Sequence, residues 1–319
     1  MTRSIRTSRR TSTRSRPCEV KSFVSKSLIE KGWSPDKKYR AVTSDGEVFL
    51  LRVMPGTDPE AFRPAFERQR NLSEMGIPMC DPLEFGPMPQ GGSYVVQRWI
   101  DGEDAEPALA RMDPEAQYRF GLEAGRILRR IHSLPPPTDA PDWEPRFGAK
   151  IDRKIRGYLD CPLRIDGDEA IFRYLKENRK YLRGRPNVWQ HGDYHVGNMM
   201  FERDESGVPA KLTIIDFNRE DYGDPWEEFN RIVWCAQTSP VFARGRIDGY
   251  FDGEPPALFW RLLCLYIASN TLSSIYWAVP FGEREIDTMT KQAADVLRWF
   301  DHMENPVPLW YREKGKGTL

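Results

Sequence analysis

A change in hydrophobic periodicity partway along the chain is the feature that most constrains its fold. Residues 37–54 and 93–100 alternate apolar and polar positions, the first run around Asp45-Gly46, so they predict a hairpin and a further strand. Residues 59–75 predict one helix between them. From Asp113 onward apolar residues recur at helical spacing instead. The sequence therefore predicts an α+β fold with a small β-rich N-terminal part and a larger helical C-terminal part.

One hairpin interrupts the predicted helical part. Residues 211–219, "KLTIIDFNR", read as a short buried strand, and "GNMMFERD" just upstream reads as its partner. Everything after residue 224 reads as helical. We expect three segments, namely a disordered basic extension, a small β-rich lobe and a larger helical lobe, at residues 1–17, 18–103 and 104–319.

Charge is distributed unevenly although the formal net charge is +0. Residues 1–16 contain six arginines and no acidic residue, so the remaining chain is mildly acidic. An acidic body suits a neutral or cationic partner better than nucleic acid. The Arg-rich start has no apolar core, so it is not a secretory signal.

Neither a membrane location nor a secreted one is predicted. No run of eighteen apolar residues occurs, and even 257–279 is interrupted by Arg261, Ser269 and Asn270. The five cysteines are scattered and form no C-x-x-C pair, which favours reduced thiols and a cytoplasmic protein.

The segment "WQHGDYHVGNMM", residues 189–200, allows three interpretations. His191 and His195 have the spacing of zinc ligands on a helix, but Gly192 stands where such a site needs a glutamate. The segment could also be a structural loop before a hairpin. The third interpretation is the catalytic loop of a kinase, with Asp193 as the base and Asn198 as a metal ligand.

A kinase needs a second metal-binding carboxylate from a separate backbone segment. Asp216 in "TIIDFN" lies at the end of the predicted buried strand, shortly after Asn198. Asp193 would then orient the acceptor hydroxyl and accept its proton, while Asn198 and Asp216 would bind Mg²⁺. We expect His191 to brace the loop, and we assign His195 no definite role.

"QHGDYHVGNMM" together with "IIDFNREDYGDPWEEF" resembles the aminoglycoside phosphotransferase family, over nearly the whole chain after residue 20. That resemblance implies a bilobal protein-kinase-like fold and transfer of the γ-phosphoryl group from ATP, or GTP, to a hydroxyl of a small molecule with Mg²⁺. It implies that residues 18–103 form the N-terminal nucleotide-binding lobe and residues 104–319 the C-terminal catalytic and substrate-binding lobe. It also implies that Asp224, in the segment "DYGDPWEEF", caps a helix and holds the metal loop.

The same resemblance implies a set of nucleotide-contacting residues. "GWSPDKKYRA" is similar to the family's nucleotide-positioning loop, and "YVVQRWIDGED" to the segment that joins the lobes. Arg52 stands where the family usually has a phosphate-binding lysine, and either Glu67 or Ala65 takes the position of the helical residue that pairs with it. The cofactor-binding residues implied are Ser34, Asp36, Lys37, Arg52, Glu67, Arg98, Trp99 and Ile100.

An aminoglycoside acceptor would need carboxylates and sugar-stacking aromatic rings. The acceptor-binding residues expected are Glu220, Asp221, Trp226 and Glu227. Further carboxylates considered are Glu228, Asp160, Asp166, Asp168 and Glu169, and further aromatic residues, equally suited to the core, are Trp234, Tyr250, Trp260, Tyr276 and Trp277.

Two other functions stay open. A nucleotide-binding pseudokinase is motivated by Arg52, and a nucleic-acid-binding protein by the basic start. Within the kinase interpretation, the acceptor could equally be choline, a sugar, an amino alcohol or a macrolide.

Overall fold

The computed structural model describes residues 22–30 and 35–313, so the predicted basic extension and Ser34 lie outside the described residues. The chain divides into two compact units. One comprises Met1–Phe66 and Asp81–Trp99, and the other comprises Glu67–Cys80 and Ile100–Leu319. The predicted division into a β-rich part and a helical part is confirmed, whereas the predicted boundaries at 17/18 and 103/104 stay predictions.

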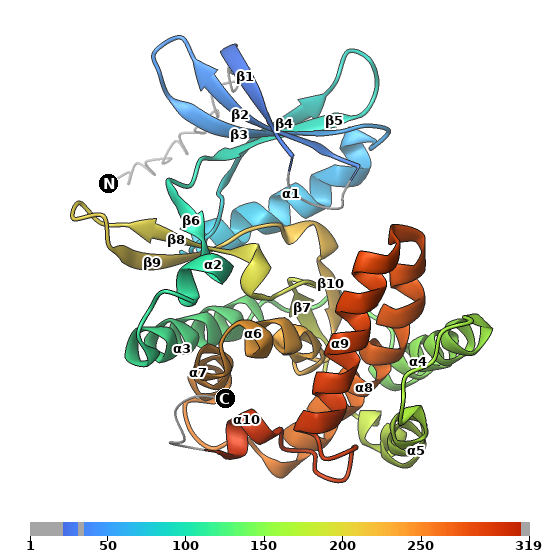
Figure 1. Cartoon of the computed structure of the whole chain (residues 1–319). Coiled ribbons are helices and arrows are strands. Elements are labelled where there is room, and N and C mark those ends of the chain that lie inside the picture. Colours follow the sequence, from blue (N-terminus) through green and yellow to red (C-terminus); the bar gives the residue numbers. More distant parts are fainter. Residues whose placement is uncertain (1–21, 31–34, 314–319) are drawn as a thin grey trace, which may run out of the picture. The chain divides into compact units, whose positions relative to one another are not determined.

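The N-terminal unit is built on a five-stranded antiparallel sheet with the order β1-β2-β3-β5-β4 (Figure 1). The strands are β1 (Phe23–Ile29), β2 (Lys37–Thr43), β3 (Val48–Met54), β4 (Pro82–Pro87) and β5 (Ser93–Arg98). Successive residues of β5 contribute to different apolar clusters: Val96 packs with Phe49 and Leu51, and Val95 packs with Met54 and Phe66. Phe66 belongs to α1 (Pro59–Glu74), the helix expected at 59–75.

Two strands of this sheet were not predicted. In β1 all five central residues are exposed, so no alternation of apolar and polar residues marks it as a strand. β4 begins at Pro82, and a proline at that position predicts a break rather than a strand. Proline is tolerated in a sheet at an edge, and β4 is an edge strand.

The C-terminal unit contains the predicted hairpin and most of the helices (Figure 1). The predicted strand 211–219 is too long, because the observed strand ends at Ile214 and residues 217–219 form a 3-10 turn. β8 (Met199–Arg203) pairs with β9 (Pro209–Ile214) and with β6 (Gly102–Asp104), and β7 (Val188–Gln190) pairs with β10 (Asp221–Gly223). The helices are α2 (Ala105–Leu109), α3 (Pro114–Ile131), α4 (Trp143–Asp160), α5 (Asp168–Asn178), α6 (Ile232–Thr238), α7 (Pro240–Phe251), α8 (Ala257–Ala278), α9 (Glu283–Trp299) and α10 (Leu309–Arg312). The 3-10 turns are η1 (Arg179–Leu182), η2 (Val196–Asn198), η3 (Phe217–Arg219), η4 (Glu227–Arg231) and η5 (Val279–Phe281).

Helices α3 and α7 pack backbone against backbone because each carries two glycines one turn apart. A Cβ atom at Gly125 of α3 would lie 2.2 Å from the Arg246 carbonyl oxygen, and one at Gly249 of α7 would lie 2.1 Å from the Leu122 carbonyl oxygen. Only glycine fits at such distances. This close packing of α3 and α7 positions Arg246 of α7, which contacts the loop 191–198.

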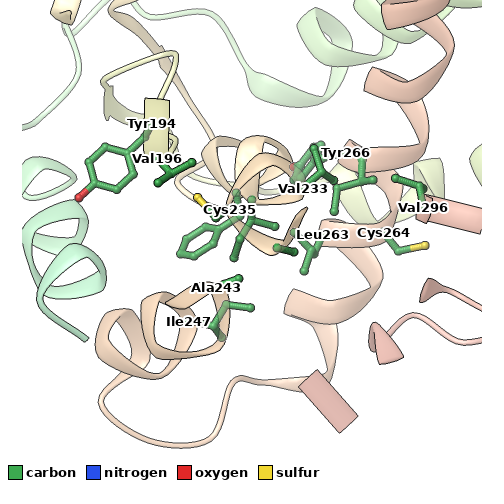
Figure 2. Packing of buried hydrophobic residues seen from close by; sticks show 14 of the residues in the cluster. Tyr194, Val196, Val233, Cys235, Ala243, Ile247, Leu263, Cys264, Tyr266 and Val296 are labelled. Atoms are coloured by element: carbon green, nitrogen blue, oxygen red, sulfur yellow. The ribbon is translucent and has the colours of Figure 1, made fainter. Parts of the chain in front are cut away.

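The longest helix, α8, runs through the hydrophobic core. Its residues Leu263, Cys264 and Tyr266 lie among buried side chains of α6 and α9, such as Val233 and Val296 (Figure 2). Within the described residues α8 is the one helix long and apolar enough to cross a membrane, but most of its apolar stretch is buried inside the protein. Its apolar composition is therefore explained by packing.

Candidate active site

The loop 191–198, here called the Asp193 loop, connects β7 to β8 and has a backbone that requires glycine at position 192. Gly192 has φ +81°, and a Cβ atom there would lie 1.7 Å from the Arg219 carbonyl oxygen. A side chain would therefore meet both a strained conformation and a direct clash. Gly192 lets the loop turn back against the segment that carries Asp216, and it rules out the helix that a zinc site of the H-x-x-x-H type needs.

His191 joins the Asp193 loop to the end of β9. Its Nε2 donates to the Ile215 carbonyl oxygen at 3.0 Å, and its Nδ1 accepts from the Asp193 backbone N–H at 3.2 Å. Burial lowers the pKa of His191 below its usual value and outweighs the negative charges of Glu228 and Asp193, which by themselves would raise it. The imidazole is therefore neutral, as its acceptor role at Nδ1 requires.

Asn198 and Asp216 reach the same region from adjoining segments. The Ile215 backbone N–H donates to the Asn198 carbonyl oxygen at 3.0 Å. The Asn198 side-chain amide donates to the Asp193 carbonyl oxygen at 2.9 Å, which leaves its own amide oxygen for another partner. Asp216 has φ +66° and accepts a hydrogen bond from Asn218. Strained carboxylates of this kind cluster at functional sites.

The donor set suits magnesium. Carboxylate and amide oxygens from two segments are hard ligands, and Mg²⁺ typically takes only one or two protein ligands besides water and phosphate oxygens. In residues 22–30 and 35–313, no three His, Cys, Asp or Glu side chains gather as a metal-holding group. A closed zinc site would need such a group, whereas Asn198 with Asp216 does not.

Asp193 lies among basic side chains. Arg231 Nε is 3.2 Å and His195 Nε2 is 3.6 Å from its Oδ1, and Arg219 Nε is 3.8 Å from its Oδ2. Burial by itself raises the pKa of Asp193, but the contact with His195 and the charges of Arg231 and Arg219 outweigh it and hold the pKa well below its usual value. Asp193 is therefore ionised at neutral pH.

Glu228 fixes the Asp193 loop through hydrogen bonds to its backbone. Its two carboxylate oxygens accept the backbone N–H groups of His191 at 2.8 Å and of Gly192 at 2.6 Å. His132 Nε2 lies 3.3 Å from the same carboxylate, and Tyr250 in turn hydrogen-bonds His132 Nδ1 at 2.9 Å. Burial by itself raises the pKa of Glu228, but the contact with His132 and nearby charges outweigh burial and hold the pKa below its usual value. The carboxylate therefore stays ionised.

This position corrects one expectation from the sequence. Glu228 was considered as an acceptor-binding carboxylate, yet its side chain is fully buried. The sequence "DPWEEF" gives no signal that separates it from its neighbour Glu227, which is also largely buried. The signal available was its place at the end of the run G-D-P-x-x-E that begins at Gly223.

Helices α3 and α7 fix the other side of the loop. Arg246 is fully buried and donates to the Tyr194 carbonyl oxygen at 2.8 Å. The Tyr194 hydroxyl donates to the Ala124 carbonyl oxygen of α3 at 2.7 Å. The glycine-mediated packing of α3 on α7 therefore sets the position of the residue next to Asp193.

Asp224 anchors the segment that follows. It accepts two hydrogen bonds from Arg185, at 2.7 and 2.8 Å, and one from the Tyr266 hydroxyl at 2.6 Å. It also caps the next turn by accepting the Trp226 backbone N–H at 3.0 Å. Asp224 is fully buried, so its contacts are structural.

Comparison with known proteins identifies the family of the chain. The model of the "Phosphotransferase enzyme family" matches residues 27–260. The chain belongs to this family. A search of curated protein sequences gave no match.

Solved structures share the fold. A choline/ethanolamine kinase family protein from Mesorhizobium loti superposes with a TM-score of 0.61 at 19% identity, over 88% of this chain and 91% of that one. The GDP complex of wild-type aminoglycoside 2'-phosphotransferase-IIIa gives 0.58 at 15% identity, over 86% and 93%. Amicoumacin kinase hAmiN, in complex with AMP-PNP, Ca²⁺ and Ami, gives 0.60 at 12% identity, over 88% and 90%. The predicted kinase-like fold is thereby confirmed.

Of the nucleotide-contacting residues implied by membership of this family, Arg52 has the most informative environment. It is buried in β3, and its Nε donates to Asp36 at 2.6 Å. Asp36, expected beside the phosphates, is thus a carboxylate partner of Arg52. The assignment of Glu67, an exposed residue of α1, stays a prediction.

The other predicted nucleotide residues are placed as follows. Lys37 is an exposed residue at the start of β2. Arg98 Nε lies 3.0 Å from Asp81 Oδ2, and the ring of Trp99 lies under Arg40. Ile100 is buried, so only its backbone could meet a nucleotide. Their roles stay predictions.

Each predicted acceptor-binding carboxylate already has a cation of the chain as its partner. Glu220 pairs with Arg68, and Asp221 pairs with Arg146. Glu227 lies 3.1 Å from Lys150 Nζ. Trp226 packs under the Arg185 guanidinium, 3.7 Å from ring centroid to Cζ, and against Phe251 and Phe259. These pairings reduce the negative charge that a polycation would need.

Proposed function

We propose that this protein is an ATP-dependent phosphotransferase that moves the γ-phosphoryl group to a hydroxyl of a small molecule. The observation that carries the proposal is the convergence of Asp193, Asn198 and Asp216, held together by His191 and Glu228. Family membership supports the reaction class, and two structurally similar proteins were solved with GDP or with AMP-PNP and Ca²⁺. ATP is our proposed donor and Mg²⁺ our proposed metal.

In this proposal Asp193 orients the acceptor hydroxyl toward the γ-phosphorus. A bond forms between the hydroxyl oxygen and the γ-phosphorus, and the bond from that phosphorus to the bridging oxygen of ADP breaks. The hydroxyl proton passes to the Asp193 carboxylate, and the products are ADP and a phosphomonoester. Because neighbouring cations hold the pKa of Asp193 low, the proton then leaves for solvent and the base is regenerated.

Asn198 and Asp216 would hold the metal, and Arg52 would contact the phosphates. Mg²⁺, when bound, supplies charge neutralisation of the polyphosphate. His191 and Glu228 contact neither reactant and act as positioning residues. The retained Asp193, Asn198 and Asp216 favour activity over a pseudokinase role, and we place the enzyme in the cytoplasm.

The test is an ADP-release assay on the purified chain with MgATP and a panel of hydroxyl compounds that includes sugars, amino alcohols, hydroxy acids and aminoglycosides. We expect at least one acceptor class to raise ADP release above the rate without acceptor. A panel in which no compound does so, with a protein that binds MgATP, would favour the pseudokinase instead. An aminoglycoside acceptor stays a prediction from the sequence, and the ion pairs above do not favour it.

A further inference from the structure

One face of α4 carries three cations, spaced four residues apart, and contacts η4, the turn whose Glu228 holds the Asp193 loop. Arg146, Lys150 and Lys154 lie at successive turns of the helix and so share one face. Arg146 pairs with Asp221 and Lys150 pairs with Glu227, so the first two are neutralised. Lys154 is the third.

Lys154 has no carboxylate partner among the residues that the structure describes. It is partly buried, and its Nζ lies 3.4 Å from the Asn270 side-chain oxygen of α8, a neutral group. The charged groups that act on it are Lys150, Arg153 and Arg231, all positive, and Glu227, which Lys150 already occupies. Burial and these cations lower the pKa of Lys154 to about 7. A partly buried cation without a counterion is unfavourable unless an anion binds beside it.

Arg231 connects this lysine to the proposed catalytic base. Its Nε lies 3.2 Å from Asp193 Oδ1, and its charge acts on Lys154. Arg231 belongs to η4, the turn that α4 contacts. Arg219, which is more than half exposed, is a second arginine near Asp193. An acceptor whose hydroxyl reaches Asp193 therefore meets positive charge beside that hydroxyl.

From these contacts we infer that the acceptor carries a carboxylate, as a hydroxy acid or sugar acid does, and that Lys154 and Arg231 bind it. The inference rests on the proposed phosphotransferase function and narrows its substrate class. A carboxylate would supply the missing counterion of Lys154 while its hydroxyl faces Asp193. A polycation would instead meet like charges, which disfavours its binding.

The test compares acceptors that share a skeleton and differ in charge. D-gluconate, D-sorbitol and D-glucamine form one such set, and 4-hydroxybutyrate, 1,4-butanediol and 4-amino-1-butanol form another. With MgATP we expect the carboxylate of at least one set to give the highest kcat/KM. An amine that is as good an acceptor as its carboxylate would overturn the inference while leaving the proposed function intact.

Variants of Lys154 supply the second measurement. Lys154→Met should raise KM for the carboxylate by about tenfold or more, because a charge-assisted hydrogen bond is lost, and should change kcat less. Lys154→Arg should largely retain the wild-type KM, and Lys291→Met, an exposed lysine of α9, is the matched control. An unchanged KM in Lys154→Met would overturn the inference.

Binding can be measured without turnover. We expect D-gluconate to raise the Tm of the wild type more than that of Lys154→Met, so general effects of the salt cancel in the comparison. If no acceptor of any charge raises ADP release, the proposed function fails. The difference between the two proteins in the Tm shift caused by D-gluconate still decides whether Lys154 binds a carboxylate. Equal Tm shifts in the two proteins would refute it.

Discussion

Replacing Glu228 by glutamine should loosen the Asp193 loop without removing any group that contacts a reactant. The carboxylate accepts two backbone N–H groups, at 2.8 Å from His191 and 2.6 Å from Gly192, and it faces His132. Glutamine has one acceptor oxygen and one donor NH₂ group. One of the two N–H groups would therefore face another donor in a fully buried place.

The magnitude follows from that unpaired donor. A buried donor left without an acceptor costs about 1–3 kcal/mol, which for a chain of this size lowers Tm by about 1.5–4.5 °C. The loop also carries Asp193, and a displacement of about 1 Å at a reacting group lowers turnover by about 100-fold. We expect Glu228→Gln to lower kcat by about 10-fold to 100-fold and to change MgATP affinity far less.

Glu177→Gln is the matched control for stability. It makes the same chemical change at an exposed carboxylate of α5. Surface substitutions usually change stability by no more than about 0.5 kcal/mol, so its Tm should stay close to that of the wild type. The assays are thermal unfolding and ADP release with MgATP. If Glu228→Gln matched Glu177→Gln in Tm and in turnover, our account of the loop would be wrong.

Three further predictions concern the metal site, the helix packing and the buried lysine. Asp216→Asn removes a carboxylate from the proposed metal site, so nucleotide binding should lose most of its Mg²⁺ dependence in titration calorimetry, and an unchanged dependence would exclude Asp216 as a ligand. Gly125→Ala inserts a methyl group 2.2 Å from a backbone oxygen and should lower the free energy of unfolding by about 1–3 kcal/mol or more in a denaturant titration. Gly148→Ala in α4, where nothing lies within 4 Å of the added methyl group, should be neutral or stabilising in the same titration. Equal effects of the two substitutions would contradict the packing described for α3 and α7. The pKa of Lys154 is about 7 in the folded chain and 10.5 in the reference state, so its destabilising effect is fully present below pH 7 and disappears as the pH rises toward 10.5. Lys154→Met should therefore raise Tm at pH 6.5 more than at pH 9.5, and a difference in Tm that does not change with pH would show that the lysine is not perturbed.

The elements marked by local pattern could be predicted from the sequence, and the unpatterned ones could not. The hairpin of β2 and β3, the helix α3 that starts at its cap Asp113, and the pair β8 and β9 all follow from periodicity and turn residues. β1 and β4 form because neighbouring strands satisfy their backbone groups, which is a tertiary effect.

The candidate site shows the same limit. The spacing of Asp193, Asn198 and Asp216 can be read along the chain because they lie on one loop and one nearby strand. Which cation approaches Asp193, and which glutamate holds its loop, depends on pairs distant in sequence, such as Arg231 with Asp193 and Glu228 with His132. Charge alone placed Glu227 and Glu228 in one class, and their partners separate them, because Glu227 pairs with Lys150 whereas Glu228 accepts two N–H groups of the loop.

The central claim is that Asp193 accepts the proton of an acceptor hydroxyl at a magnesium-nucleotide site. Phosphoryl transfer by Asp193→Asn, measured beside MgATP binding by the same variant, tests it most directly. We expect MgATP to bind nearly as tightly as to the wild type, and kcat to fall by about 100-fold to 10,000-fold, because the amide cannot take the proton. Wild-type turnover in the Asp193→Asn variant would contradict the claim.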